Sequence, residues 1–126
     1  MTVRVLIVDD QEPFRLAARM VVEETEGFQV VGEAETGEAS IVMAQELDPD
    51  LVLMDVNLPG MSGLEATRHI LAASDRVKIL VLSTYEDEHY DARSAEVGAA
   101  AFIPKSAFGP DRLAAAWAAA AGRGGR

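Results

Sequence analysis

Short runs of apolar, often β-branched residues alternate along the chain with longer amphipathic stretches. Most of these runs are nearly continuous in apolar character, which favours strands buried on both faces over half-exposed hairpin strands. The predicted strands are Val3–Val8, Phe28–Val31, Leu51–Met54, Val77–Leu82 and Ala100–Ile103. The predicted helices are Glu12–Glu26, Gly37–Leu47, Gly63–Ala73, Asp87–Val97 and Pro110–Ala121. Each predicted helix therefore follows a predicted strand.

This strict alternation determines the expected fold class. It predicts an α/β fold, with a doubly wound parallel five-stranded sheet and helices on both of its faces. Connections between parallel strands are right-handed, which restricts the topology further. One apolar stripe on each helix should face the sheet. The expected stripes are Phe14, Leu16, Ala17, Met20 and Val21 in the first helix, and Ala39, Ile41, Val42, Ala44 and Leu47 in the second.

The chain is predicted to form one domain over residues 1–121. Its length of 126 residues suits a single domain that buries roughly two-thirds of its unfolded surface. The segment Gly122–Arg126 contains only glycine and arginine. We expect it to be a flexible tail, or the start of a linker to an effector domain outside this chain.

Composition narrows the function. The net charge of −10 disfavours direct nucleic-acid binding by this domain, because such binding needs a basic surface. The chain has no cysteine, which excludes thiolate nucleophiles, iron–sulfur clusters and thiolate zinc sites. The apolar runs are well short of the roughly 20 residues that span a bilayer. These properties predict an acidic, soluble, cytoplasmic domain without a membrane partner.

Polar residues of catalytic type follow four of the predicted strands. Asp9 and Asp10 come directly after the first strand, and Asp55 comes directly after the third. Ser83 follows the fourth strand, and Lys105 comes shortly after the fifth. The carboxyl ends of parallel strands meet at one edge of an open sheet, where ligands and chemistry gather. We therefore expect these side chains to form a single site.

Charge indicates what such a site must hold. Two carboxylates about 4 Å apart repel by about 4 kcal/mol at an effective dielectric constant near 20. Three of them raise one another's pKa unless cations neutralise them, and Lys105 supplies only one positive charge. A magnesium ion fits the remainder, because it prefers a few carboxylates, a backbone carbonyl and water. A carboxylate beside these cations can attack a phosphoryl donor and form an aspartyl phosphate.

Each of these residues also has a plain structural interpretation. Asp9 and Asp10 can cap the helix that follows, and Asp55 can cap a turn before Pro59-Gly60. Ser83 alone is most often a satisfied hydroxyl at a strand end, and Lys105 alone is usually a solvated surface lysine. Their joint placement on four strand ends favours the functional interpretation.

Four motifs resemble one family, the receiver domains of two-component response regulators. They are Val8-Asp9-Asp10, the Asp55–Gly63 segment, Leu82-Ser83-Thr84 and the Gly98–Lys105 segment. The resemblance covers Val3 to about Ala120, with the order and spacing of the motifs typical of the family. It implies the flavodoxin-like (βα)5 fold with strand order 2-1-3-4-5, an order that the family's chemotaxis member illustrates.

The resemblance assigns a role to each strand-end residue. It implies that Asp55 is the phosphoryl acceptor and the modified residue. It implies that Asp10, Asp55 and the main-chain carbonyl of Asn57 bind Mg²⁺, which Mn²⁺ can replace, and that Asp9 acts through water. Ser83 and Lys105 would contact the phosphoryl group. Phe102 matches the aromatic residue that turns inward when the hydroxyl of Ser83 moves.

The same resemblance implies a signalling phosphoacceptor rather than a metabolic enzyme. The phosphodonor would be the phosphohistidine of a sensor histidine kinase, and the domain would catalyse both its own phosphorylation and its own dephosphorylation. The switch through Ser83 and Phe102 would alter the surface of the fourth helix, fifth strand and fifth helix. A homodimer is plausible through that surface or through the last helix, whose Leu113 and Trp117 share one face.

A more local resemblance concerns the output. The Ser83–Glu88 segment, and a lysine followed by Ser106 instead of proline, resemble receivers of the NarL/LuxR type. Those receivers are attached to helix-turn-helix domains. This implies transcription regulation, with DNA bound by a C-terminal domain outside this chain.

Alternatives from other classes remain. A pseudo-receiver would use the same fold as an interaction module without phosphorylation, although the intact acids, hydroxyl and lysine disfavour it. A Mg²⁺-dependent phosphatase with an aspartyl nucleophile typically has a second acid two residues later, where this chain has Asn57. A nucleotide-binding fold is disfavoured because neither a GxxxxGK[ST] loop nor a GxGxxG turn is present.

Overall fold

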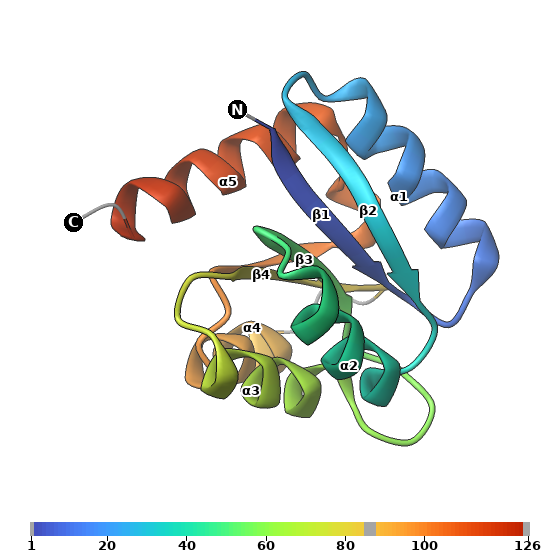
Figure 1. Cartoon of the computed structure of the whole chain (residues 1–126), viewed down its shortest axis with the longest axis vertical. Helices are drawn as coiled ribbons and strands as arrows, with labels where there is room; N and C mark the ends of the chain where they lie inside the picture. The colour runs from blue at the N-terminus through green and yellow to red at the C-terminus, as the bar shows by residue number, and fades with distance from the viewer. Residues whose placement is uncertain (1, 85–87, 125–126) are drawn as a thin grey trace.

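A parallel sheet lies at the centre of the structure, in the order β2-β1-β3-β4-β5 (Figure 1). The computed structural model describes residues 2–84 and 88–124. The strands are β1 (Val3–Val8), β2 (Phe28–Ala34), β3 (Leu51–Asp55), β4 (Lys78–Ser83) and β5 (Ala101–Pro104), and all neighbours are parallel. The helices are α1 (Glu12–Glu24), α2 (Gly37–Leu47), α3 (Gly63–Ala73), α4 (Glu88–Glu96) and α5 (Pro110–Gly124), with a 3-10 turn η1 (Lys105–Ala107). The expected α/β class and strand order are confirmed.

The helices cover both faces of the sheet. Helices α1 and α5 contact each other on one face, α2 and α3 contact each other on the other, and α4 lies against β5 (Figure 1). Successive residues of β1 serve opposite layers: Val5 and Ile7 pack in the core under α1 and α5, while Leu6 and Val8 pack in the core under α2 and α3. This two-sided burial explains why the strand sequences are continuously apolar.

Two helices begin and end where the sequence predicted. Thr36 caps α2, with its hydroxyl oxygen accepting the Ala39 N–H at 3.0 Å. Ser62 caps α3 in the same way, accepting the Glu65 N–H at 3.2 Å. Each cap satisfies a backbone donor that the first turn of a helix leaves without a partner, so the start of the helix is encoded locally.

The predicted apolar stripe of α1 was wrong at three residues, Leu16, Ala17 and Met20, which are all exposed. Leu16 is 55% exposed and Met20 is 60% exposed, while Ala18 and Val22 are fully buried beside the partly buried Phe14. The buried residues recur at four-residue steps, whereas Leu16 and Met20 lie two residues away from them, which is about 200° around the helix. Val42 of α2, also expected to face the sheet, is 52% exposed.

Several other ends differ from the prediction. Strand β2 continues past Val31 to Ala34, because Gly32, Glu33 and Ala34 pair with the end of β1 although their side chains do not look strand-like. Helix α5 continues to Gly124 instead of ending at Ala121, so the flexible tail predicted from Gly122 is helical as far as Gly124. The predicted start of the fourth helix at Asp87 lies outside the described residues.

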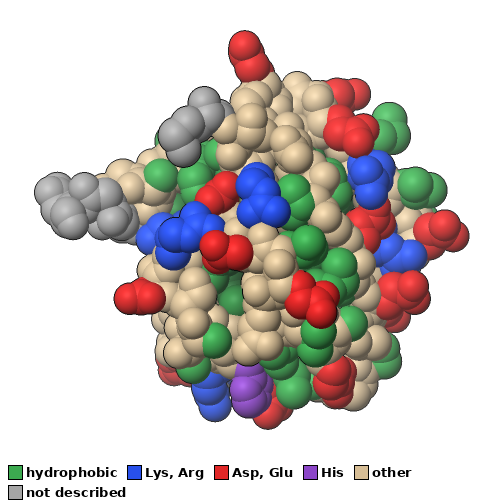
Figure 2. All heavy atoms as spheres, viewed as in Figure 1, with side chains coloured by type: hydrophobic (Ala, Val, Ile, Leu, Met, Phe, Trp, Pro, Cys, Tyr) green, Lys and Arg blue, Asp and Glu red, His purple; other side chains and the backbone are tan. Residues whose placement is uncertain are grey.

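The surface is mixed in charge. Acidic side chains are spread around the face in Figure 2, with lysine and arginine side chains among them. The acidic side chains that give the net charge of −10 therefore do not form one continuous patch on that face. Within the described part of the chain, no helix combines the length and the apolar character that a bilayer crossing requires.

Candidate functional site

The sheet brings the predicted acids together at the carboxyl ends of its central strands. Asp9 follows β1, and Asp55 is the last residue of β3. Asp9, Asp10 and Asp55 each present a carboxylate oxygen within 4.8 Å of the others. Asp9 and Asp55 are buried, at 1% and 4% exposed, while Asp10 is open to solvent. The single acidic site expected from the strand ends is therefore present in the geometry.

Lys105 joins this cluster from the turn after β5. Its Nζ lies 2.6 Å from Asp9 Oδ2 and 3.4 Å from Asp55 Oδ1. The lysine side chain is only 14% exposed, so the interaction occurs in a site largely shielded from water. Lys105 is therefore not the solvated surface lysine of the structural interpretation.

Ser83 and Phe102 lie on the neighbouring strands β4 and β5. Ser83 ends β4 opposite Pro104, and its side chain is fully buried. Phe102 pairs with Val81 one step earlier and packs, partly buried, against the core under α2 and α3. Pro104 lacks a backbone donor, which suits its place on the edge strand β5.

Asn57 lies in the loop between β3 and α3, and its side chain is exposed. The end of this loop turns back on the strand: Gly63 donates its N–H to the Val56 carbonyl at 2.9 Å. A Cβ at Gly63 would stand 1.9 Å from the Asp55 carbonyl oxygen. Only glycine therefore allows α3 to begin this close to the Asp55 backbone, which fixes the base of the loop.

The pKa of Asp55 is raised to about 6. Burial is the main cause and the negative charge of Asp9 is the second, while Lys105 and a backbone hydrogen bond from Asn57 act in the opposite direction. The cluster thus holds more negative charge than Lys105 alone offsets. Carboxylate oxygens from Asp9, Asp10 and Asp55, clustered within 4.8 Å, are the donor type that Mg²⁺ prefers, and the residues present fit that ion.

Sequence reasoning missed Arg15. Its guanidinium donates to the Asp9 carbonyl at 2.8 Å, and its Nε lies 3.3 Å from Glu33 Oε1 on β2. Arg15 thereby fixes the chain segment that carries Asp9 and Asp10. A basic residue in the first turn of a helix is unfavourable to the helix dipole, and this was the available signal that it has a tertiary partner.

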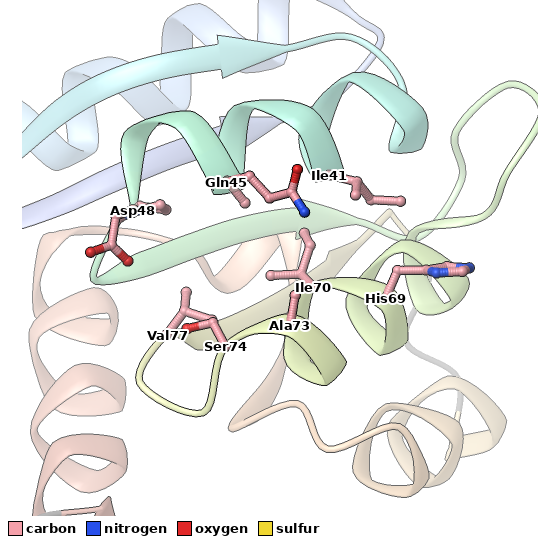
Figure 3. Close-up of a pocket in the computed structure, with 10 residues that line it drawn as sticks. Ile41, Gln45, Asp48, His69, Ile70, Ala73, Ser74 and Val77 are labelled. Carbon is pink, nitrogen blue, oxygen red and sulfur yellow. The ribbon is translucent and has the colours of Figure 1, made fainter.

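A cavity of about 420 Å³ lies elsewhere, between α2 and α3 (Figure 3). Ile41 and Gln45 of α2 point into it from one side, and Ile70 of α3 from the other (Figure 3). Among the described residues that line it, none belongs to the predicted site. This cavity and the strand-end cluster of Asp9, Asp10 and Asp55 are therefore separate features of the described structure.

Comparison with known proteins points to one family. The sequence profile described as "Response regulator receiver domain" matches residues 5–118. The response regulator GacA of Pseudomonas aeruginosa is 41% identical over 105 residues, which are 83% of this chain and 49% of GacA. The response regulator UvrY of Escherichia coli is 39% identical over 105 residues, which are 83% of this chain and 48% of UvrY. The chain thus spans about half the length of these curated relatives.

Solved structures agree. A LuxR-family two-component response regulator from Aurantimonas superposes with a TM-score of 0.89 at 33% identity, covering 97% of this chain and 87% of that one. The signal receiver domain of NarL from Mycobacterium tuberculosis superposes with a TM-score of 0.88 at 26% identity, covering 96% of this chain and 98% of that one.

Proposed function

Because this chain belongs to the response regulator receiver domain family of two-component systems, we propose that it accepts a phosphoryl group on Asp55 from the phosphohistidine of a sensor histidine kinase. The observation that carries the proposal is the cluster of Asp9, Asp10 and Asp55 within 4.8 Å, with Lys105 Nζ 3.4 Å from Asp55 Oδ1. The family membership gives the signalling role, and the cluster supplies the groups that the transfer needs.

In the proposed transfer, a carboxylate oxygen of Asp55 attacks the phosphorus. A P–O bond forms, the P–N bond to the kinase imidazole breaks, and its electron pair returns to the ring nitrogen. Lys105 and Ser83 would donate to the phosphoryl oxygens as charge accumulates on them. Asp10, Asp55 and the Asn57 carbonyl would bind Mg²⁺ or Mn²⁺, and Asp9 would act through water. The bound ion would neutralise part of that charge.

The return reaction uses the same groups. A water molecule attacks the phosphorus, the P–O bond to Asp55 breaks, and inorganic phosphate leaves with the carboxylate restored. The domain is accordingly a self-dephosphorylating phosphoacceptor, not a metabolic enzyme. The exposed positions of Asp10 and Asn57 support water access to this side of the site.

Phosphorylation would reach the surface through Ser83 and Phe102. The phosphoryl group adds about −1.5 to −2 charges and new acceptor oxygens. A shift of the buried Ser83 hydroxyl toward it would free volume that the partly buried Phe102 ring fills from the adjacent strand. This movement would alter the surface of α4, β5 and α5 and thereby change homodimerisation or the contacts with the output domain. The face of α5 is a second candidate for the dimer interface.

The output is proposed to lie outside this chain. GacA is about twice as long as the part that matches, and a LuxR-family regulator is among the structural neighbours. A C-terminal helix-turn-helix domain would bind DNA and regulate transcription. The net charge of −10 supports the assignment of DNA contact to that other domain.

The test is the intact mass after incubation with Mg²⁺ and acetyl phosphate, or with a phosphorylated sensor kinase. The wild type should gain one phosphoryl group that hydroxylamine removes, as expected for an acyl phosphate. Asp55→Asn should gain none, and Asp75→Asn, which changes an exposed aspartate, should behave as wild type. A gain that survives Asp55→Asn contradicts the assigned acceptor. No gain in any variant, with a donor that phosphorylates a known receiver, would favour the pseudo-receiver.

A further inference from the structure

The side chain of Lys105 extends from the turn after β5 to Asp9 and Asp55, which lie at the ends of β1 and β3. The short backbone turn that carries Lys105 constrains the position of this side chain only weakly. Lys105 begins the short 3-10 turn η1, and Phe108 closes the turn by donating its N–H to the Lys105 carbonyl at 3.2 Å. The peptide bond to Ser106 is trans. A flexible four-carbon stem on a short turn does not by itself place an ammonium group.

An aromatic ring lies against this ammonium group. Lys105 Nζ stands 4.3 Å from the centroid of the Phe14 ring, within the roughly 6 Å over which a cation is attracted to a ring face. The Phe108 ring contacts Phe14 with centroids 6.4 Å apart and planes tilted by 45°. The contact between Phe14 and Phe108 therefore connects the backbone turn of Lys105 to helix α1.

The first turns of α1 also hold the acid that Lys105 contacts. Phe14 touches the ammonium group, while the next residue, Arg15, donates to the Asp9 carbonyl at 2.8 Å. Neighbouring residues of one helix thus contact both partners of the 2.6 Å Lys105–Asp9 interaction. The ring attracts the positive charge without an oxygen acceptor, so the ammonium protons remain available to oxygen atoms.

We propose that Phe14 is a positioning residue that holds the Lys105 ammonium group between Asp9 and Asp55. The proposal rests on the proposed function, since it explains how the amine is kept ready for a phosphoryl oxygen. Its physical basis is the ring face, and an aromatic residue at position 14 is therefore required. Phe108 supports the Phe14 ring from the other end of the turn.

The chain offers an internal reference for the test, because Lys78 and Lys105 are its only lysines. The protein is acetylated with a limiting amine-reactive ester, without metal or phosphodonor, and the two sites are quantified by peptide mass spectrometry. In Phe14→Leu and Phe14→Met, Lys105 should react about two- to tenfold faster relative to Lys78 than in the wild type, which matches the usual strength of a cation–ring contact. In Phe14→Tyr and Phe14→Trp, Lys105 should react as slowly relative to Lys78 as it does in the wild type.

Controls separate positioning from general stability. Leu16→Ala and Met20→Ala change exposed side chains of the same helix and should leave the Lys78-to-Lys105 ratio unchanged. Circular dichroism identifies any variant that does not fold. Because Phe14→Leu and Phe14→Met are two independent aliphatic replacements, the reactivity of Lys105 can be compared with the wild type in whichever of them is folded. The same variants are then phosphorylated with acetyl phosphate, where the aliphatic ones should be slower and the aromatic ones should restore the rate.

Two results would overturn the proposal: a Lys105 reactivity in Phe14→Leu and Phe14→Met equal to that of the wild type, or an equal increase in Phe14→Tyr and Phe14→Trp. Because acetylation needs no phosphodonor, its outcome is independent of the proposed function. A wild type that is never phosphorylated, but whose Lys105 reactivity follows the ring at position 14, would refute the function and leave the positioning role intact.

Discussion

Lys105 is closer to Asp9 than to Asp55: its Nζ lies 2.6 Å from an oxygen of the first and 3.4 Å from an oxygen of the second. The amine therefore compensates mainly the negative charge of Asp9, and the Asp55 carboxylate is compensated only in part. Burial and the remaining charge of Asp9 then raise the pKa of Asp55 to about 6. The negative charge around the proposed acceptor is therefore only partly compensated, which favours the binding of a further cation.

The pKa of Asp55 predicts a pH-dependent stability. In the folded protein the pKa of Asp55 is raised from its ordinary value of 3.8 to about 6. Between these values the folded state binds more protons than the unfolded state, so this group destabilises the fold progressively as pH rises through that range, with no further change above it. Asp55→Asn lacks this titration. Its stability relative to wild type should increase by about 1–3 kcal/mol from pH 4 to pH 7.

Urea unfolding in the presence of a chelator, at several pH values for both proteins, measures this difference. Asp75→Asn, at an exposed position, should show a constant difference from the wild type across the same range. A constant difference for Asp55→Asn as well would show that the pKa of the Asp55 carboxyl is not raised.

Magnesium should stabilise the protein through the acidic cluster. A ligand that binds only the folded state adds about 2.7 kcal/mol at a hundred times its dissociation constant. We expect thermal unfolding of the wild type to shift upward with Mg²⁺, and Asp10→Asn and Asp55→Asn to lose most of that shift. Scanning calorimetry with increasing Mg²⁺ tests this, and shifts of equal size in wild type and both variants would place the ion elsewhere.

Asp50 should be important for stability at the opposite end of the sheet. One of its carboxylate oxygens accepts the Arg4 N–H at 2.9 Å, and the other accepts from the Arg76 guanidinium at 2.5 Å. Burial acts to raise the pKa of Asp50, but the hydrogen bonds from Arg4 and Arg76 outweigh it, and the pKa is lowered overall.

Asp50→Asn should accordingly lower the free energy of unfolding by about 1–2 kcal/mol at neutral pH. Because the pKa of the folded state is below the unfolded value, the contribution of Asp50 is present above pH 4 and is lost as pH falls through the folded value. Chemical denaturation at pH 7 and pH 3 measures both effects. Phosphorylation of Asp55 should be retained, and its loss would show that the two ends of the sheet are coupled.

Gly63→Ala should disrupt the loop between β3 and α3. The new Cβ would stand 1.9 Å from the Asp55 carbonyl oxygen, and backbone atoms cannot move aside as a flexible side chain does. We expect a loss of stability of about 3 kcal/mol or more, since a clash with backbone exceeds ordinary overpacking. Gly122→Ala is the matched control: apart from its chain neighbours and the backbone of its own helix, no heavy atom lies within 4 Å of the added Cβ. In helix α5 this change should be neutral or slightly stabilising. Thermal unfolding of both variants decides the point.

Phe102→Ala should separate phosphorylation from its consequence. The ring lies on β5 and does not belong to the acidic cluster, so Asp55 should still be phosphorylated. The phosphorylation-dependent change in self-association, followed by analytical ultracentrifugation with and without acetyl phosphate, should be weakened. An association that responds as in the wild type would reduce Phe102 to a core residue.

Local signals determined which parts of the structure were predictable. Strand β1 and the two helices with Thr36 and Ser62 as caps were predicted at their observed ends, because burial on both faces and capping are encoded in neighbouring residues. The acids at the strand ends followed from the parallel sheet. The proposed roles of these acids still depend on the phosphorylation experiments.

The contributions of Phe14 and Arg15 were not predictable in the same way. Phe14 appeared only as one residue of an apolar stripe, and Arg15 was not singled out. Their contacts with Lys105 and Asp9 exist because α1 packs beside the end of β1 and the turn after β5, an arrangement between distant segments. Spacing along one helix does not encode such contacts.

The complete burial of β3 has a consequence for local unfolding. All five residues of this central strand are buried, and Asp55 is the last of them. Backbone amides in such a strand exchange with solvent deuterium only through large openings of the molecule, whereas exposed loop residues such as Asn57 exchange through local fluctuations. The proposed acceptor therefore lies at a boundary in hydrogen-exchange protection. Its backbone belongs to a fully buried strand, while the adjacent loop can adjust to an incoming phosphodonor without unfolding that strand.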